Sequence, residues 1–185
     1  MIMPALPVLI AFLAASALPA SAREYALQSD TTTVRFSYHQ VGFVRSDGRI
    51  EKATGNGAFD PDRPEASSVE VRLDMKSLTI GAGWFDGKLH GPDYFDVDRF
   101  PTATFRSTQV VTTGAGKAVI TGDLTLHGVT RRISLTATCH RTDGALALNA
   151  RAHIRRSDFG IDRDRLLIGD EIDLDITATA VALRD

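Results

Sequence analysis

The sequence predicts an all-β domain in which eight or nine antiparallel strands form a barrel or a sandwich. Apolar and polar residues alternate with a period of two in successive runs along the chain, which is typical of strands with one buried face. Short segments rich in turn-forming residues separate these runs, so strands that follow one another are expected to pair. Cys139 is the only cysteine, so no disulfide within the chain supports the domain.

The clearest turn lies within residues 121–133, where two alternating runs meet at His127-Gly128. Glycine readily takes the positive φ that a tight reversal between two strands requires. The segment therefore predicts a β-hairpin whose two arms each present one apolar face. A lone hairpin is marginal in water, so the rest of the chain must supply the sheet that covers it. The apolar residues of the two arms are Val119, Ile120, Leu124, Leu126, Ile133, Leu135, Ala137 and Cys139.

The other strands follow along the chain, each bounded by turn residues. Gly55 and Gly57 interrupt one run and indicate a bend or a bulge there. Residues 60–64 read Asp-Pro-Asp-Arg-Pro and predict a turn, because proline cannot continue a central strand. The runs expected to form strands are 25–28, 33–40, 50–59, 69–76, 102–111, 119–126, 133–139, 145–155 and 172–180.

Residues 81–101 break this rhythm. They show no alternation and combine clustered glycines with five aromatic residues, which are Trp84, Phe85, Tyr94, Phe95 and Phe100. We expect one or two helical turns here, packed over one end of the β-domain. Two roles stay open at this point: a lid or binding loop, and a plug that completes the core.

Residues 1–22 have the features of a secretory signal peptide. They contain no charged side chain, their centre is apolar, and Ala20-Ser21-Ala22 is a small-x-small cleavage site. The alternative is a membrane anchor, but the run between Pro4 and Pro19 is roughly 15 residues long, whereas a bilayer core needs about 20. The sequence thus predicts a domain at 23–185 that is exported to the periplasm, without a stable membrane span.

Charge and motifs argue against several classes of function. The formal net charge of −2 gives no electrostatic reason to expect nucleic acid or an anionic membrane as a partner. No two of the five histidines have a tight metal-ligand spacing, and no Gly-x-Ser-x-Gly nucleophile motif occurs. No metal, cofactor or catalytic residue is therefore assigned.

Two further features leave alternatives open. Alternation places the thiol of Cys139 on the apolar face, where a buried and inert thiol is expected ahead of a nucleophile or an intermolecular bridge. Charged residues crowd the segment 155–170, and a solvated ladder of charges is the default interpretation. The alternative is that an inward Arg156 or Asp158 binds a polar head group. The charged residues are Arg155, Arg156, Asp158, Asp162, Arg163, Asp164, Arg165 and Asp170.

Several motifs, in this order, resemble the signature of the YceI-like proteins. They are DGKLH (86–90), DYFDV (93–97), FPTATF (100–105), GDLTLHGVT (122–130), RSDFGI (156–161) and IGDE (168–171). The resemblance runs from about Tyr25 to Val181. It departs in one place, because the His-Ser usual shortly before the second strand is Thr31-Thr32 here, while His39 is kept.

This resemblance implies an exported, antiparallel, eight-stranded, lipocalin-like barrel with a short helical or loop segment over one end. It also implies that the interior holds a polyisoprenoid or a similar long-chain amphiphile. Eight strands enclose enough room for side chains or for one small ligand, and the inward positions mix bulky with small residues. The residues expected to contact an isoprenoid or acyl lipid are Phe36, Tyr38, Leu73, Trp84, Leu89, Phe95, Phe105, Leu124, Leu135, Ala137 and Phe159.

The function expected from these observations is that of a periplasmic binding or carrier protein, not of an enzyme. Two rivals remain. An enzyme acting on such a lipid would need titratable groups facing the cavity, and His39 with His127 or Asp158 is the place to look. The other rival is a structural or stress protein with a filled core and no ligand. A homodimer is also left open.

Overall fold

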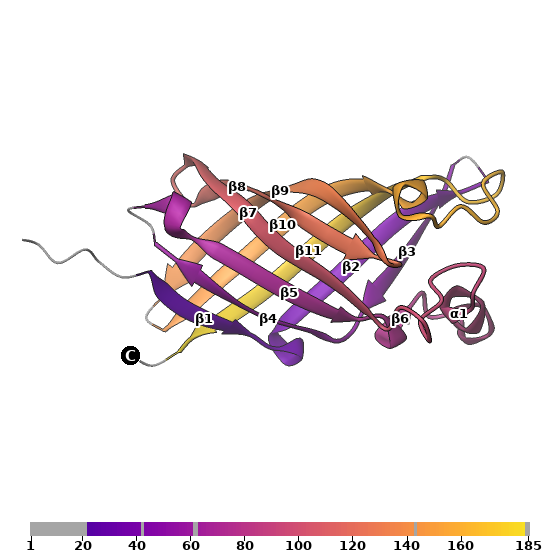
Figure 1. Ribbon diagram of the computed structural model, residues 1–185, viewed down its shortest axis with the longest axis horizontal. Coiled ribbons are helices and arrows are strands. Elements are labelled where there is room, and N and C mark those ends of the chain that lie inside the picture. Colours follow the sequence, from indigo (N-terminus) through magenta and orange to yellow (C-terminus); the bar gives the residue numbers. More distant parts are fainter. Residues whose placement is uncertain (1–21, 42, 61–62, 143, 184–185) are drawn as a thin grey trace, which may run out of the picture.

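The alternating runs form strands that close into one antiparallel β-barrel, with a short helix at one end (Figure 1). The computed structural model describes residues 22–41, 43–60, 63–142 and 144–183. The ring closes where β1 pairs with β11, with Tyr25 opposite Ala182. The expected eight-stranded antiparallel barrel is therefore confirmed. Its strands are β1 (Arg23–Leu27), β4 (Ala53–Phe59), β5 (Ser68–Asp74), β7 (Thr102–Gly114), β8 (Lys117–Leu126), β9 (Val129–Thr142), β10 (Ala145–Arg155) and β11 (Glu171–Ala182).

Three further strands, β2 (Thr32–Gln40), β3 (Val44–Ile50) and β6 (Leu78–Thr79), lengthen the barrel wall at one end. Each continues a strand of the ring: β2 follows β1 after the 3-10 turn η1 (Ser29–Thr31), β3 leads into β4, and β6 follows β5 after η3 (Met75–Ser77). β2 pairs with β11 beside β1, and β3 then pairs with both β2 and β6. Two more 3-10 turns, η2 (Pro64–Ala66) and η4 (Arg156–Phe159), lie between strands.

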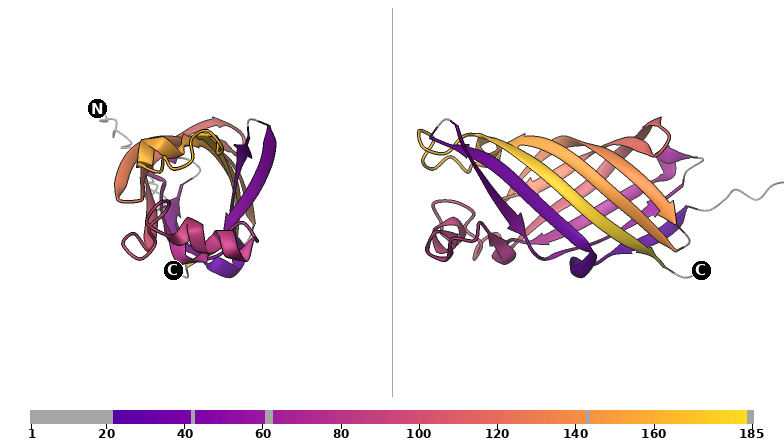
Figure 2. Two further views of the ribbon diagram at one scale, coloured as in Figure 1. Left: turned by 90° about the vertical axis from the view of Figure 1, so that its right-hand side faces the viewer. Right: turned by 180° about the vertical axis from the view of Figure 1, so that it is seen from behind.

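The helix α1 (Gly83–His90) lies across the end of the barrel that β2, β3 and β6 extend (Figure 2). The Asp86 carboxylate accepts hydrogen bonds from the Thr79 hydroxyl at 2.6 Å and the Ile80 amide at 2.8 Å, and the Thr79 bond is the main cause that lowers the Asp86 pKa. His90 Nε2 lies 2.8 Å from the Leu78 carbonyl. Both side chains therefore hold α1 against β6, and the helical turns predicted over one barrel end are confirmed.

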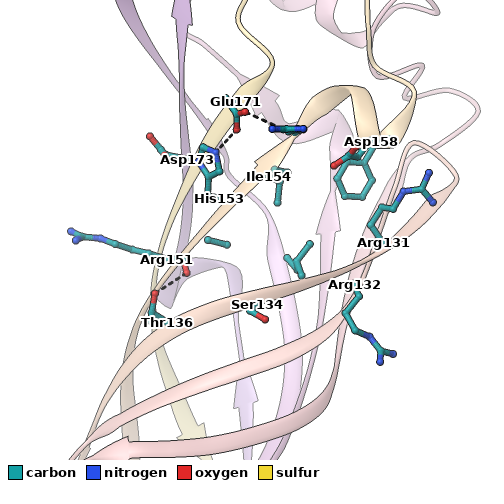
Figure 3. A pocket seen from close by; sticks show the side chains of 14 residues that line it. Arg131, Arg132, Ser134, Thr136, Arg151, His153, Ile154, Asp158, Glu171 and Asp173 are labelled. Carbon is teal, nitrogen blue, oxygen red and sulfur yellow. Dashed lines mark hydrogen bonds and ion pairs between the residues drawn. The ribbon is translucent and has the colours of Figure 1, made fainter.

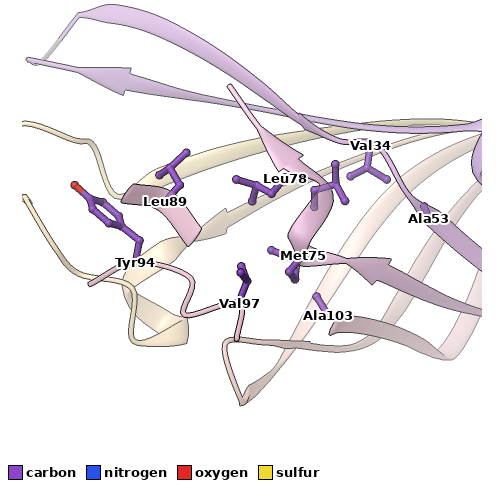
Figure 4. Close-up of a cluster of buried hydrophobic side chains, with 9 residues drawn as sticks. Val34, Ala53, Met75, Leu78, Leu89, Tyr94, Val97 and Ala103 are labelled. Atoms are coloured by element: carbon purple, nitrogen blue, oxygen red, sulfur yellow. The ribbon is translucent and has the colours of Figure 1, made fainter. Parts of the chain in front are cut away.

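The segment around α1 is also joined to the core. Leu89, Tyr94 and Val97 are buried against side chains of the barrel wall (Figure 4). The contact removes apolar surface of both the segment and the barrel wall from water. The segment therefore contributes to the hydrophobic stabilisation of this end. The buried cluster comprises Val34, Ile50, Ala53, Met75, Leu78, Leu89, Tyr94, Val97 and Ala103.

The hairpin predicted at His127-Gly128 is confirmed. β8 and β9 pair up to Leu126 and Val129, so the loop has two residues. Both of them have a positive φ, 51° at His127 and 73° at Gly128, as a type I′ turn requires. A Cβ atom on Gly128 would lie 2.5 Å from Cε1 of Phe100, so this turn has no room for a side chain at that position.

Two strands were not predicted: β3 and the two-residue β6. β3 begins at Val44, although residues 44–49 show no apolar alternation, and it is held by backbone pairing with β2. The break in the next run lies at residues 51–52, whereas Gly55 and Gly57 sit inside β4 and pair with β5 without a shift of register. A bulge at these two glycines is therefore excluded, and the alternative of a bend stays a prediction.

Some predictions fall on residues outside the described part of the chain. These are the signal peptide, of which only Ala22 is described, and two residues of the turn at 60–64. Within the described ranges, no helix is long and apolar enough to span a bilayer.

Candidate functional site

Three cavities lie inside the barrel, one after another from the α1 end to the end where β11 finishes. The mouth cavity, bordered by Phe36, Leu89 and Ile168 among others, has a volume of about 100 Å³. The middle cavity, bordered by Leu73, Phe105 and Ile176 among others, has about 120 Å³. The far cavity, bordered by Tyr25, Phe59 and Leu146 among others, has about 80 Å³.

Neighbouring cavities share part of their lining. Ile50, Met75, Leu126 and Leu174 border both the mouth cavity and the middle cavity. Leu27, Val69, Ile120 and Leu148 border both the middle cavity and the far cavity. Five of these eight shared residues are methionine or leucine, whose side chains can change rotamer more readily than those of the β-branched Ile50, Val69 and Ile120.

The chemistry of the lining is apolar almost throughout. Thr32 is the one residue with a polar side-chain atom that borders the middle cavity, among the residues that the structure describes. Apolar surface of this kind favours a hydrocarbon chain, at about 25 cal/mol per Å² removed from water. The interior can therefore hold an apolar chain and offers little to bind a charged or strongly polar molecule.

Eight of the eleven residues predicted to contact a ligand border these cavities. Phe36, Tyr38, Leu89 and Phe95 border the mouth cavity. Leu73, Phe105, Leu124 and Leu135 border the middle cavity. Their side chains come from β2, α1 and its following turn, β5, β7, β8 and β9, and closure of the barrel brings them together.

The other three predicted residues border none of the three cavities. Trp84 points outward from α1 with 76% of its surface exposed, and it contacts Phe85 and Lys88. Ala137 faces inward but is closely packed with Ile120 and Ala150. Phe159 is almost completely buried in a separate cluster with Leu124, Ile154 and Ile161.

The far cavity was not anticipated, although part of the signal is present in the sequence. Leu146 and Leu148 alternate along β10 and share the inward face with Ala150, so their alternation could have identified them. Tyr25 and Leu27 lie in a strand too short for a periodic pattern to be convincing. Cys139 also borders this cavity, and burial raises the pKa of its thiol, in line with the expected inward position.

Two buried hydroxyl groups near the cavities have no hydrogen-bond partner within the described chain. They are Oη of Tyr25, beside the far cavity, and Oγ1 of Thr32, beside the middle cavity. An unpaired buried hydroxyl costs roughly 1–3 kcal/mol. Thr32 belongs to the Thr31-Thr32 pair at which the sequence departs from the YceI-like pattern, and Thr31 in contrast hydrogen-bonds the Gln28 carbonyl.

Arg156 is buried at the mouth cavity, and its guanidinium is held by the protein's own backbone. It donates to the carbonyl oxygens of Gly169 (2.9 Å), Ile161 (3.0 Å), Arg163 (2.8 Å) and Ile168 (2.8 Å). Burial lowers its pKa. Arg156 thus holds the loop between η4 and β11 in place. Because Arg156 is buried, it does not belong to the ladder of solvated charges that was expected for this segment.

A larger and charged cleft of about 820 Å³ opens on the outer face, between β9 and β10 (Figure 3). It forms because β10 pairs with β9 only as far as Arg151 opposite Thr136, after which the two strands separate. Opposite charges neutralise one another here: Arg155 pairs with Glu171, and Arg151 pairs with Asp175. Asp158 borders this outer cleft, not the interior.

His153 in this cleft is poorly suited to act as a general base. Its Nδ1 lies 2.9 Å from Asp173, and its Nε2 contacts Glu171. These two hydrogen bonds raise the His153 pKa, so the positively charged ring is favoured and neither nitrogen is free to accept a proton. Ser134, which borders the same cleft, hydrogen-bonds Thr121 instead.

Comparison with known proteins points to one family. The model of the YceI-like domain matches residues 25–180. A UPF0312 protein of Vibrio cholerae serotype O1 is 35% identical over 120 residues, which is 64% of this chain and 64% of that protein. The aligned stretch thus spans less than two thirds of this relative.

Solved structures show the same barrel at low sequence identity. The crystal structure of BcnA from Burkholderia cenocepacia has a TM-score of 0.79 and 23% identity, and the match covers 84% of this chain and 99% of BcnA. A domain from Saccharophagus degradans, described as polyisoprenoid binding and implicated in plant cell wall breakdown, has a TM-score of 0.67 and 14% identity. That match covers 88% of this chain and 99% of the domain. These likenesses concern the fold.

Proposed function

The chain belongs to the YceI-like domain family, and on this premise we propose that it is a periplasmic binding or carrier protein for a polyisoprenoid or a similar long-chain amphiphilic lipid. One observation carries the proposal: three apolar cavities follow one another inside a closed barrel, and each neighbouring pair has side chains of its lining in common. A long, thin and apolar guest fits such a series better than a compact one. The Saccharophagus domain of the same fold, described as polyisoprenoid binding, supports the choice of ligand class.

Entry of the guest requires the shared side chains to move. Met75 and Leu174 separate the mouth cavity from the middle cavity, and both have several rotamers of similar energy. The gain is the removal of the guest's apolar surface from water, about 0.8 kcal/mol for each CH₂ group. A long chain therefore gains enough to offset the rearrangement, whereas a short one does not.

The direct test is to purify the protein from the periplasm of cells that express the full chain, to extract it with organic solvent and to identify what is released by mass spectrometry. We expect a near-stoichiometric long-chain lipid. Its absence from protein that is folded and exported would contradict the proposal. Recovery of the protein from the cytoplasm alone would contradict the periplasmic location but not the binding.

A matched pair of variants links the lipid to the interior. Ala178 borders the middle cavity, whereas Ala137 is buried in close packing and borders none of the three. Ala178→Phe should fill the cavity and expel the lipid while the barrel stays folded. Ala137→Phe should instead destabilise the barrel by roughly 1–3 kcal/mol, because close-packed atoms have to move apart. Retention of the full lipid content by a folded Ala178→Phe variant would contradict an interior site.

The two rival functions lead to different results. None of His39, His127 and Asp158 borders an interior cavity, and no hydrogen bond or ion pair joins any two of these three described residues. A lipid-modifying enzyme would release a chemically altered lipid after incubation, whereas a carrier releases the lipid unchanged. A ligand-free protein with a filled core would yield no lipid and would be destabilised by Ala178→Phe as much as by Ala137→Phe.

A further inference from the structure

Large apolar side chains are exposed around the mouth of the barrel. Six of the nine exposed large hydrophobic residues in the described chain lie at the α1 end. Phe43 is 83% exposed and Leu166 is 97% exposed. Isolated exposed residues need no explanation, but a cluster of them indicates an interaction surface. We call this cluster the rim patch; it consists of Val41, Phe43, Val44, Trp84, Leu166 and Leu167.

Three segments of the chain build the rim patch: the β2–β3 turn, the loop between η4 and β11, and α1 (Figure 2). The first two are fixed to each other, since the Val41 amide donates to the Leu167 carbonyl at 2.8 Å and Gln40 forms a β-bridge with Ile168. Val41 has a φ of 45°, a conformation that β-branched residues rarely adopt. Glycine or asparagine would adopt this φ with less strain. The chain instead has valine here, with its apolar side chain exposed to water.

The rim patch is continuous in sequence with the lining of the mouth cavity. Ile168 borders that cavity and directly follows Leu166 and Leu167, and Leu89 borders it one helical turn after Trp84 and Phe85. Two of the three segments that carry the rim patch therefore also contribute to the lining of the mouth cavity.

Charges around the patch largely cancel. Arg45 pairs with Asp47, Arg163 with Asp164 and Arg165 with Asp162, and Lys88 lies 5.7 Å from the centre of the Trp84 ring. Salt-bridged pairs of this kind provide no strong field of either sign. The surface is thus suited to an apolar partner and not to a highly charged one.

We propose that the rim patch docks the mouth of the barrel on the surface of a lipid bilayer. Its side chains come from three separate segments, and a fluid bilayer can accommodate such a surface without shape complementarity. Tryptophan is favoured at the membrane–water interface, where Trp84 would lie. The biological purpose of docking rests on the proposed function, since a lipid could then pass between bilayer and barrel without crossing water; the docking itself does not depend on it.

Trp84 is the only tryptophan of the chain, so its fluorescence reports directly on the rim. The experiment mixes protein isolated from the periplasm with neutral phosphatidylcholine vesicles, and measures flotation and the Trp84 emission maximum. We expect co-flotation, a shift of the emission to shorter wavelength, and little change between low and high salt, because binding is driven by apolar insertion.

Two double variants make the test specific. Phe43→Ser with Leu166→Ser removes two rim side chains, whereas Val111→Ser with Val181→Ser removes two that are exposed at the opposite end. Burial of one such rim side chain is worth about tenfold or more in a binding constant. The rim variant should therefore lose vesicle binding at least tenfold, and the control variant should bind like the unmodified protein.

The possible results are distinct. An unmodified protein that does not bind vesicles, or equal losses in both variants, would overturn the inference. A concentration-dependent dimer that only the rim variant loses, without vesicle binding, would assign the patch to a second copy of the chain and would also overturn it. Lipid content by mass spectrometry separates the two proposals: vesicle binding without any extracted lipid would leave docking valid and the carrier function wrong.

Discussion

The phenolic hydroxyl of Tyr94 donates a hydrogen bond to the Asp164 carboxylate across 2.5 Å. The bond joins the segment that follows α1 to the loop that follows η4, two segments that meet at the mouth of the barrel (Figure 1). Burial, together with this bond, raises the Tyr94 pKa to about 12. The two segments that close this end are thus joined by a group that keeps its proton across the physiological range.

Removal of this hydroxyl should weaken the mouth in a pH-dependent manner. Tyr94→Phe should lower the free energy of unfolding by about 1 kcal/mol at neutral pH. The folded-state pKa lies above the unfolded value of about 10, so the contribution is complete below pH 10 and is lost as the pH rises toward 12. Thermal melts of both proteins from pH 8 to pH 12 test this; a difference in stability that stayed constant above pH 10 would contradict it.

Replacement of Arg156 by lysine should destabilise the fold although the positive charge is kept. Lysine keeps the charge but cannot reach the carbonyls of Gly169, Ile161 and Ile168 together, because its donors radiate from one atom. Arg156→Lys should destabilise the fold by roughly 2–4 kcal/mol in urea unfolding. Arg155→Lys is the matched control: Arg155 is exposed with one carboxylate partner, Glu171, and should change stability by no more than about 0.5 kcal/mol. Similar losses in both variants would refute the role assigned to Arg156.

Two buried tyrosines should respond in opposite ways to loss of the hydroxyl. The Tyr25 hydroxyl has no hydrogen-bond partner among the residues that the structure describes, whereas the Tyr38 hydroxyl accepts a bond from Gln40 at 3.1 Å. Tyr25→Phe should leave the stability of lipid-free protein unchanged or raise it by up to about 1 kcal/mol, and Tyr38→Phe should lower it by about 1 kcal/mol. Denaturant unfolding of protein freed of lipid measures both; a clear loss in Tyr25→Phe would reveal a partner for its hydroxyl.

His153 should make the outer cleft more stable at low pH. Its hydrogen bonds to Asp173 and Glu171 raise the folded-state pKa above the ordinary value of about 6.5. The stabilisation is therefore complete below that value and is lost as the pH rises through the raised pKa. The site is exposed, so we expect only a few tenths of a kcal/mol. His153→Gln should abolish this part of the pH dependence between pH 5 and 9, and His140→Gln, at an outward position on β9, should not.

Much of the fold could be predicted because burial leaves a periodic trace in the sequence. Val34 lies between the exposed residues Thr33 and Arg35, and the strand that contains it was placed within one residue of β2. β3 leaves no such trace, since backbone pairing holds it and most of its side chains face water. Gly48, inside β3, leaves room for the ring of Phe36: a Cβ atom at this position would lie 2.2 Å from Cζ of Phe36.

The interior site was predictable to the extent that strand alternation determines which side chains point inward. Leu73, Phe105, Leu124 and Leu135 follow from it. Trp84 does not, because an aromatic residue on a short helix can face either way and neighbouring segments decide. Ala137 faces inward as expected, yet it borders none of the three interior cavities, because the positions of these cavities depend on the volumes of residues distant in sequence.

Closure of the ring through β1 and β11 also determines when the barrel can form. Tyr25 and Ala182 are partners in this pairing although almost the whole domain lies between them in sequence. β11 pairs in addition with β10 and β2. Three strands, β1, β2 and β10, therefore cannot complete their pairing before β11 is present. Contacts between such distant residues slow folding, typically to milliseconds or seconds. Until the final strand is added, β1, β2 and β10 each lack one neighbour, and exposed strand edges of this kind make the incomplete barrel prone to aggregation.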